Sequence, residues 1–353
     1  MLNIKESVLK LDGYVVSQDF SRVKLNQNES PFDVPLEIKQ EISEKLTQVN
    51  WNRYPNNFAD PLKRRISQYI NFPRKGIIVG NSSTELIQTV MHALCNSYDR
   101  IVVTNPGFPI YKRLASILNI KVEEVPLSEN FSLDTDALIE KSKGAKIVFL
   151  SSPNNPTGNV LSVEDLTLIA GNITGILVVD EAYYEFYKDS AQHLIKMLKN
   201  IIIIRTFSKA FNLAGIRLGY MLGNDEVLKE LGKAKLPFSI GIFQQLAGEV
   251  VMANMDFVKK NVLEVVNERE RVYNELKRIP FIHPFPSYAN FILFRSKTMP
   301  AKDLFRALYD KGVVLRTFKT PELRNCLRVT LGTKTENGFF LRKLKEVMSN
   351  SLK

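Results

Sequence analysis

The stretch IIIIRTFSKAFNLAGIRLGY, residues 201–220, places two cations directly after a run of apolar residues. The four isoleucines predict a buried strand, and the polar residues that follow it are Thr206, Ser208, Lys209 and Arg217. Lysine and arginine are rarely fully buried unless they are paired. Hydroxyl, ammonium and guanidinium groups together suit a phosphate, so this stretch indicates a loop that binds an anionic ligand.

Further polar residues follow other apolar runs. Asp180 comes directly after the apolar residues of VVDEAYY, and a buried carboxylate is costly unless it meets a cation or hydrogen-bond donors. Asn155 lies in the proline-flanked turn SSPNNPTG, and Phe108 in NPGFP offers a flat ring. In GNSSTELI a helix opens at residues 82–84, and its free backbone N–H groups predict an anion site.

These groups match different parts of one molecule. The amine of Lys209 could react with an aldehyde, the carboxylate of Asp180 could bind a protonated ring nitrogen, and the amide of Asn155 could bind a ring hydroxyl. The loop after residue 204 could bind a phosphate. Pyridoxal 5′-phosphate carries all four groups, and a protein that binds it mainly positions and tunes the electron sink that the cofactor supplies. We therefore predict this cofactor, and we predict no metal.

Strands and helices alternate in the region that positions these residues. Apolar, β-branched runs predict strands, and amphipathic stretches between them predict helices. The strands are expected at 76–80, 100–106, 121–127, 146–153, 175–183 and 200–208, and the helices at 83–95, 108–119, 135–143 and 162–172. This order favours an α/β fold with a mostly parallel central sheet, whose ligands bind beyond the carboxyl ends of the strands.

The pattern changes after Gly232. Sustained helical periodicity over residues 242–279 predicts one long helix. The segments 289–295, 301–312, 313–318, 327–333 and 339–349 then suggest a smaller α+β domain, against which the N-terminal segment is expected to pack. We predict a large domain at residues 45–255 and a small domain formed by residues 1–44 and 256–353.

Composition narrows the class of partner. The chain has 353 residues and a net charge of +11, but its basic residues are mixed with acids and show no nucleic-acid motif, which favours anionic metabolites. Cys95 and Cys326 lie far apart, which favours a reducing compartment. No apolar run approaches the ~20 residues that cross a bilayer. We therefore expect a soluble, cytoplasmic protein that binds neither nucleic acid nor membrane.

Over nearly its whole length the sequence resembles the fold-type I PLP-dependent aminotransferases, and among them the histidinol-phosphate aminotransferase family. The motifs around Lys209 and in the NNPTG turn are the most specific. The resemblance is carried by residues 24–32 (KLNQNESPF), 53–56 (RYPN), 80–87, 105–111 (NPGFPIY), 151–158, 178–186 (VVDEAYYEF), 205–220, 288–293 (YANFIL), 312–316 (GVVLR) and 327–333 (LRVTLGT). It implies the PLP-dependent transferase fold type I.

The resemblance also implies a role for each matching residue. Lys209 would bond covalently to the cofactor and move the proton, Asp180 would pair with its ring nitrogen, and Tyr183 and Asn155 would hydrogen-bond its ring oxygen. Phe108 would stack on the ring, where many relatives have tyrosine. The groups implied to hold the cofactor phosphate are Ser208, Arg217, Thr206 and the backbone at Ser83 and Thr84, joined by Tyr54 from the other subunit of a homodimer.

Substrate contacts are implied at four positions. Arg328 would bind an anionic group of the substrate, Asn155 would also contact the substrate, and Arg316 and Tyr14 match positions that contact a substrate phosphate. The expected reaction moves an amino group between glutamate and imidazole-acetol phosphate. Alternatives are an aromatic amino acid aminotransferase, a phosphothreonine decarboxylase, which is disfavoured because KLNQNES replaces its HGGN, and a PLP-binding regulator, which would need an added N-terminal segment.

Overall fold

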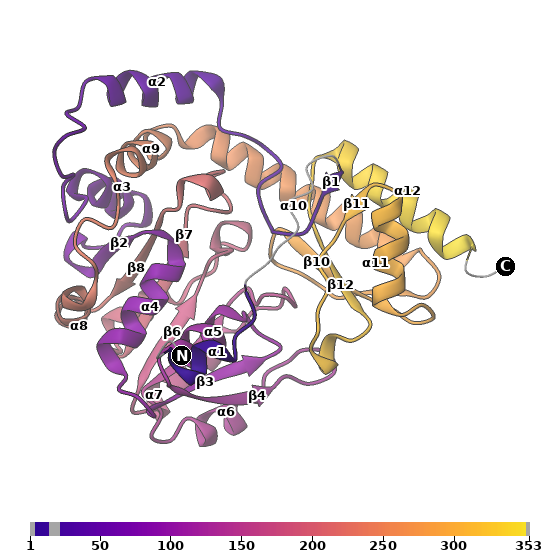
Figure 1. Cartoon of the computed structure of the whole chain (residues 1–353), viewed down its shortest axis with the longest axis horizontal. Coiled ribbons are helices and arrows are strands. Elements are labelled where there is room, and N and C mark those ends of the chain that lie inside the picture. Colours follow the sequence, from indigo (N-terminus) through magenta and orange to yellow (C-terminus); the bar gives the residue numbers. More distant parts are fainter. Residues whose placement is uncertain (1–3, 14–21, 351–353) are drawn as a thin grey trace.

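A computed structural model describes residues 4–13 and 22–350 of the chain. Among these residues, seven strands form a central sheet in the order β2-β8-β7-β6-β5-β3-β4. Helices cover both faces of this sheet, and a second group of strands and helices lies beside it (Figure 1). The α/β class with a mostly parallel central sheet is confirmed.

The predicted strands of the central sheet are all present. They are β2 (Ile77–Gly80), β3 (Arg100–Asn105), β4 (Lys121–Pro126), β5 (Ile147–Ser151), β6 (Ile176–Asp180) and β7 (Ile201–Thr206). An additional strand, β8 (Gly219–Gly223), was not predicted and runs antiparallel between β2 and β7. Its sequence GYMLG contains two glycines and no β-branched residue, so it has a weak strand signal.

The isoleucines of β7 show why the sheet is buried on both faces. Ile202 and Ile204 pack under α4 and α5, whereas Ile201 and Ile203 belong to the larger apolar cluster on the opposite face. Successive strand side chains point to opposite faces, so a strand covered on both sides must be apolar at every position. A polar residue can therefore enter only where such a strand ends.

The remaining elements have these bounds. The helices are α1 (Glu6–Leu9), α2 (Leu36–Thr47), α3 (Asp60–Ile70), α4 (Ser82–Leu94), α5 (Ile110–Ile117), α6 (Thr135–Lys141), α7 (Val163–Asn172), α8 (Asp225–Leu231), α9 (Ile242–Ala253), α10 (Met255–Lys277), α11 (Ala301–Asp310) and α12 (Lys334–Asn350). Short 3₁₀ turns are η1 (Arg74–Gly76), η2 (Tyr184–Phe186), η3 (Ala191–Lys196), η4 (Ala214–Ile216), η5 (Gly232–Ala234) and η6 (Pro321–Leu323).

Two smaller sheets belong to the second group of elements. β9 (Ile282–Pro284), β10 (Phe291–Ser296) and β12 (Cys326–Thr330) form an antiparallel sheet, and β1 (Val23–Lys24) pairs in parallel with β11 (Val313–Val314). The pairing of β1 confirms that the N-terminal segment packs against the C-terminal elements. The domain limits at residues 45 and 255 remain a prediction.

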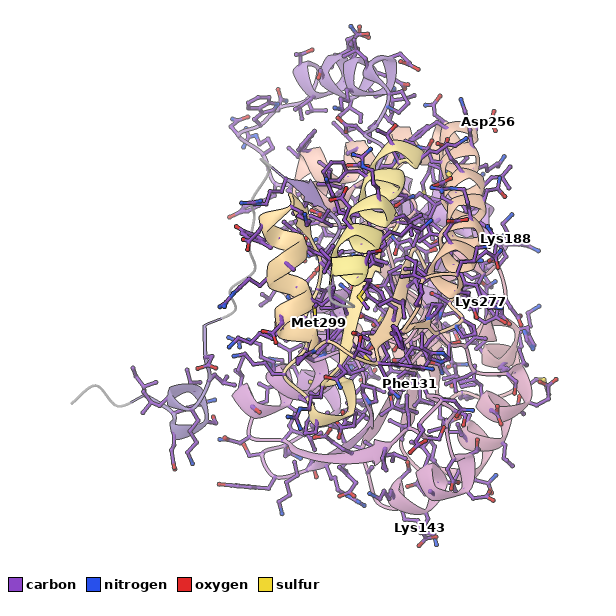
Figure 2. All side chains as sticks on the ribbon, turned by 90° about the vertical axis from the view of Figure 1, so that its right-hand side faces the viewer. Phe131, Lys143, Lys188, Asp256, Lys277 and Met299 are labelled. Atoms are coloured by element: carbon purple, nitrogen blue, oxygen red, sulfur yellow. The ribbon has the colours of Figure 1, made fainter. Side chains whose placement is uncertain are left out.

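The prediction of one long helix over residues 242–279 is wrong. The structure has two helices, α9 and α10, separated at Asn254. The Asn254 side chain donates to the Val250 carbonyl oxygen at 2.9 Å and to Glu41 of α2 at 3.3 Å. Asparagine competes with the helix in this way through side-chain hydrogen bonds to the backbone. From Asp256 to Lys277, α10 then follows one margin of the molecule (Figure 2).

A buried ion pair holds the ends of β6 and β7 together. The guanidinium of Arg205 donates to Glu181 Oε2 through Nε at 2.9 Å and Nη2 at 2.8 Å, and its side chain is 1% exposed. Glu181 also accepts from the Ser190 hydroxyl and the Ala191 backbone N–H, both at 2.9 Å. Asp180 directly precedes Glu181, so this pair fixes the backbone at the sheet edge where the predicted site lies. Among the described residues no helix is long and apolar enough to span a membrane.

Candidate active site

Lys209 lies three residues beyond the end of β7 and is half-buried. Its Nζ donates to the Gln27 carbonyl oxygen at 3.1 Å. Burial, and then the positive charge of Arg328, lower the pKa of Lys209 from 10.5 to about 7. About half of the amine is therefore neutral near pH 7, and the neutral form is the one that acts as a nucleophile or a proton acceptor.

Asp180 is the last residue of β6 and is 4% exposed. Its Oδ2 accepts from the Tyr111 hydroxyl at 2.7 Å, and its Oδ1 accepts from the Ala182 backbone N–H at 3.1 Å. Burial raises the pKa of Asp180 to about 6, while these hydrogen bonds and the charge of Lys209 act in the opposite direction. A buried carboxyl of this kind would be stabilised as an anion by a cation placed beside it.

Tyr111 is a functional residue that sequence reasoning missed. It is buried near the start of α5, stacks on Phe149 with ring centroids 4.8 Å apart, and meets the Phe108 ring edge-on at 5.5 Å. The only signal was its spacing: Tyr111 follows Phe108 by three residues at a helix start, so the two side chains share one side. Phe108 is thereby brought to the Asp180 side of the site.

Hydroxyl and guanidinium groups gather at the end of β7. The Thr206 hydroxyl donates to Ser208 Oγ at 3.0 Å and accepts from the Ser208 backbone N–H at 3.1 Å. Arg217 donates to the same Ser208 Oγ at 3.4 Å and has a positive φ of 60°. Left-handed backbone at a non-glycine residue is strained and concentrates at functional sites. The structure thus joins Thr206, Ser208 and Arg217 as predicted.

The start of α4 lies against the same group. Gly219, which pairs with Thr206 across the sheet, approaches Ser83 so closely that an added Cβ would lie 2.7 Å from the Ser83 backbone nitrogen. Ser82, where the helix begins, has a φ of 67°, and the Thr84 backbone N–H donates to the Ser82 hydroxyl at 3.3 Å. The N–H groups of a helix start and two hydroxyls thus form one corner whose groups suit an anion.

The opposite wall comes from more distant segments. Tyr183, 4% exposed, accepts a hydrogen bond from Asn28 Nδ2 at 2.9 Å, and Asn28 was not predicted. Arg328 donates to Asn155 Oδ1 at 2.5 Å, which joins two residues that were predicted separately. The backbones of Arg316 and Arg328 exchange two hydrogen bonds of 3.0 Å, so the two arginines lie opposite each other.

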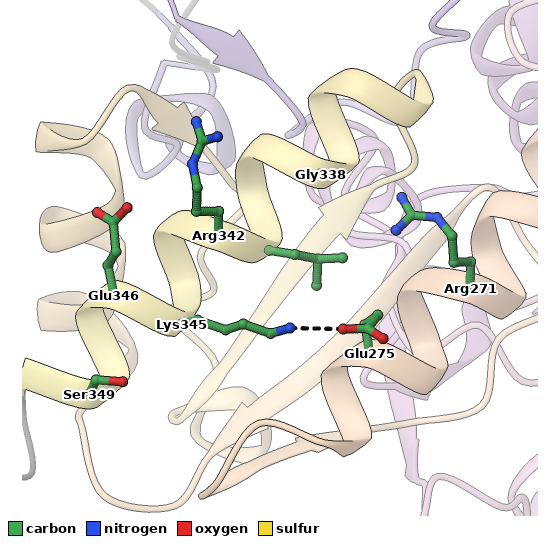
Figure 3. A pocket seen from close by; sticks show the side chains of 8 residues that line it. Arg271, Glu275, Gly338, Arg342, Lys345, Glu346 and Ser349 are labelled. Atoms are coloured by element: carbon green, nitrogen blue, oxygen red, sulfur yellow. Dashed lines mark hydrogen bonds and ion pairs between the residues drawn. The ribbon is translucent and has the colours of Figure 1, made fainter.

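One predicted residue that the structure describes, Tyr54, is not brought to this cluster. Tyr54 is 81% exposed and stacks on Phe238, with ring centroids 4.5 Å apart. Tyr14 lies outside the described residues. A separate hollow of about 760 Å³ lies between α10 and α12 (Figure 3), where Lys345 and Glu275 pair at 2.8 Å across the two helices. None of the residues that line it belongs to the strand-end cluster, so the two are distinct.

Comparison with known proteins agrees with this geometry. The family described as aminotransferase class I and II matches residues 21–344. The chain belongs to this family. The histidinol-phosphate aminotransferase of Thermococcus gammatolerans is 38% identical and that of Prosthecochloris aestuarii 36% identical, with 98% and 97% of this chain covered and 97% and 96% of theirs. These relatives group this aminotransferase with the histidinol-phosphate aminotransferases.

The fold of this aminotransferase matches that of a solved relative. The crystal structure of histidinol-phosphate aminotransferase from Sinorhizobium meliloti, in complex with pyridoxal-5′-phosphate, superposes with a TM-score of 0.89. The match covers 100% of this chain and 99% of the other at 23% identity, which establishes the shared fold. The expected fold-type I aminotransferase architecture is therefore confirmed.

The lowered pKa of Lys209 predicts a pH-dependent stability. Between pH 7 and 10.5 the unfolded chain binds a proton that the folded chain does not, so this lysine destabilises the cofactor-free protein at neutral pH. Lys209→Met should raise the free energy of unfolding at pH 7 by on the order of 2–4 kcal/mol, and the gain should vanish as the pH approaches 10.5. Urea unfolding at several pH values measures it, with the exposed Lys302→Met as control. A gain in the free energy of unfolding that did not vary with pH would contradict the lowered pKa of Lys209.

Proposed function

We propose that this aminotransferase uses pyridoxal 5′-phosphate to transfer an amino group between glutamate and imidazole-acetol phosphate, which gives histidinol phosphate for histidine biosynthesis in the cytoplasm. The observation that carries the proposal is that Lys209, with a lowered pKa, follows the end of β7, while Asp180, with a raised pKa, ends the adjacent strand β6. Environments that shift an amine and a carboxyl toward neutrality in one site are typical of catalytic centres.

The residues present fit the cofactor in charge and in hydrogen-bonding groups. Asp180 would hold the proton of the ring nitrogen, Phe108 would stack on the ring, and Tyr183 and Asn155 would contact the ring oxygen. The phosphate would lie in the corner formed by Thr206, Ser208, Arg217 and the backbone of Ser83 and Thr84. When bound, the cofactor supplies an electron sink for the charge that develops on the substrate carbon.

The protein's own residues then perform the proton transfers. Lys209 would hold the cofactor covalently and, once released from that bond, would accept and return a proton at the amino-bearing carbon of the substrate. Its lowered pKa leaves it neutral for this task. Asp180 would keep the ring nitrogen protonated, and the hydrogen bonds from Tyr111 and Ala182 favour the charged carboxylate that this requires.

Two opposed arginines support a doubly anionic substrate. Like charges directly opposite each other on neighbouring strands are unfavourable, so Arg316 and Arg328 favour an anion between or beside them. Guanidinium groups bind carboxylate and phosphate alike in a bidentate manner. The pair therefore suits both glutamate, with two carboxylates, and an acceptor that carries a phosphate, and the similarity to histidinol-phosphate aminotransferases supports the same substrates.

The exposed aromatic residues around Tyr54 support a homodimer. Tyr54 and Phe58 are 81% and 67% exposed, Phe238 stacks on Tyr54, and the exposed Leu236 lines a hollow together with Phe58. A contiguous exposed apolar patch indicates an interaction site. We infer that a second copy of the chain covers this patch and that Tyr54 contacts the cofactor phosphate held by the other copy.

Covalent attachment of the cofactor is directly testable. Purified protein loaded with pyridoxal 5′-phosphate should absorb in the near-ultraviolet and visible region, and borohydride should fix the cofactor on the peptide that contains Lys209. Lys209→Ala should lose the band and the fixed cofactor, because among the described residues of this site no other amine combines burial with a lowered pKa. Spectra and peptide mass spectrometry measure both. A band that survives in Lys209→Ala would refute the role of this lysine.

Substrate preference is tested with two acceptors in parallel. With glutamate as donor, transfer to imidazole-acetol phosphate should greatly exceed transfer to phenylpyruvate. Arg316→Gln should raise KM for the phosphorylated acceptor by roughly 10- to 100-fold, since it removes hydrogen bonds to a charged group, and should leave KM for phenylpyruvate nearly unchanged. The exposed Arg324→Gln is the matched control. Preference for phenylpyruvate would identify an aromatic aminotransferase instead.

The dimer interface is tested by charge insertion. Phe238→Asp should raise the dissociation constant of the dimer at least tenfold, because it places a carboxylate in the patch against which Tyr54 stacks. Sedimentation velocity over a range of concentrations measures it. Leu168→Asp changes a comparably exposed residue on α7 and should leave association unchanged. Equal dissociation constants for the two variants would show that the dimer interface does not include Phe238.

A further inference from the structure

The buried Asn28 lies at the meeting point of three segments of the chain. It is 1% exposed, has a φ of 54°, and contacts Tyr183 after β6 and Thr330 at the end of β12. The Asn290 side chain donates to the Asn28 carbonyl oxygen at 3.1 Å, so the backbone of Asn28 is held as well as its side chain. Buried polar groups that are this fully satisfied have one defined orientation.

The side-chain hydrogen bonds in this group run in one direction, from Thr330 to Asn28 and from Asn28 to Tyr183. The backbone N–H of Asn28 can only donate, and it lies 2.9 Å from Thr330 Oγ1. Thr330 Oγ1 accepts there and donates its own hydrogen to Asn28 Oδ1 at 3.1 Å, because with the Asn28 amide reversed this buried hydrogen would have no acceptor among the described residues. The amide oxygen of Asn28 thus faces Thr330, and its Nδ2 must face the Tyr183 hydroxyl at 2.9 Å.

These hydrogen-bond directions restrict where the hydroxyl hydrogen of Tyr183 can point. Since Asn28 Nδ2 donates to the Tyr183 oxygen, the hydroxyl hydrogen of Tyr183 must point elsewhere. Within residues 4–13 and 22–350 the hydroxyl has no hydrogen-bond partner apart from Asn28, and at 4% exposure the side chain has little access to water. The ring itself is held by an edge contact with Phe291, with centroids 5.1 Å apart.

We propose that Asn28 and Thr330 form a one-way hydrogen-bond relay that forces Tyr183 to donate its hydrogen into the active site. Both are positioning residues, because they act only through Tyr183. The proposal rests on the proposed function, in which the acceptor is the ring oxygen of pyridoxal 5′-phosphate. In this arrangement Asn28 and Thr330 fix the donor direction of Tyr183, the residue that would touch the cofactor.

The relay has a measurable electrostatic consequence. A hydrogen bond donated to the ring oxygen stabilises the negative charge on that oxygen. The oxygen then attracts less strongly the proton on the nitrogen through which Lys209 would hold the cofactor, so the pKa of that proton falls. With the relay intact, the bound cofactor should lose this proton at a lower pH. If Tyr183 donated to another group instead, the pH at which the visible absorption changes should rise.

The test is a pH titration of the visible absorption of the loaded protein. Asn28→Asp keeps the shape and the acceptor for Thr330 but replaces the amide donor by a carboxylate, so Tyr183 should turn its hydrogen to residue 28. The midpoint should rise by roughly one to two pH units, the size expected for a lost hydrogen bond to a charged oxygen. Introducing Asn28→Asp into Tyr183→Phe isolates the effect of the added charge, and the rise measured relative to Tyr183→Phe alone should be smaller by roughly one unit than the rise measured relative to wild type.

A neutral pair of variants provides an independent measurement. Thr330→Val removes the hydroxyl that orients the Asn28 amide and adds no charge, so it should also raise the midpoint, whereas Thr330→Ser should keep the wild-type value. If Asn28→Asp gives the same rise with and without Tyr183→Phe, or if Thr330→Val matches Thr330→Ser, the relay is wrong. A wild-type protein without the visible band would instead refute the proposed function, so the two failures are distinguishable.

Discussion

The burial of one carboxyl and one amine at adjacent strand ends is the constraint on which the rest of this structure depends. Burial raises the pKa of Asp180 to about 6 and lowers that of Lys209 to about 7, so both charged forms are disfavoured in the isolated chain. The surroundings offset this only in part, through Tyr111 and Ala182 at the carboxyl and the Gln27 carbonyl at the amine. A ligand with a protonated ring nitrogen and an aldehyde would use both groups.

The sheet supplies the precision that such a pair requires. β6 and β7 are parallel neighbours that are apolar on both faces, so their polar residues emerge together at one edge. The buried pair of Arg205 and Glu181 links the two strand ends immediately beside the site. A buried ion pair is weak evidence for stability, but here it fixes the backbone next to Asp180. Left-handed backbone at Ser82 and Arg217 lies at the same edge, in the corner that we propose for the cofactor phosphate.

The N-terminal segment completes the site from a distance. The carbonyl oxygens of Asn26 and Gln27 accept hydrogen bonds from Arg328 and Lys209, and the side chain of Asn28 reaches Tyr183. Three consecutive residues thus contact groups from both parts of the molecule. Because β1 pairs with β11, this segment is fixed to the C-terminal elements, so the geometry of the site depends on how those elements lie against the central sheet.

The sequence alone determined the strands, the α/β class and the strand-end residues, because those signals are local: apolar runs, turns and short motifs. It did not reveal β8, whose glycine-containing sequence carries little strand propensity, or the break at Asn254, which depends on a side-chain contact with α2. Tyr111 and Asn28 escaped for a related reason. Their partners lie 69 and 155 residues away, and only the packing of the folded chain brings such groups within hydrogen-bond distance.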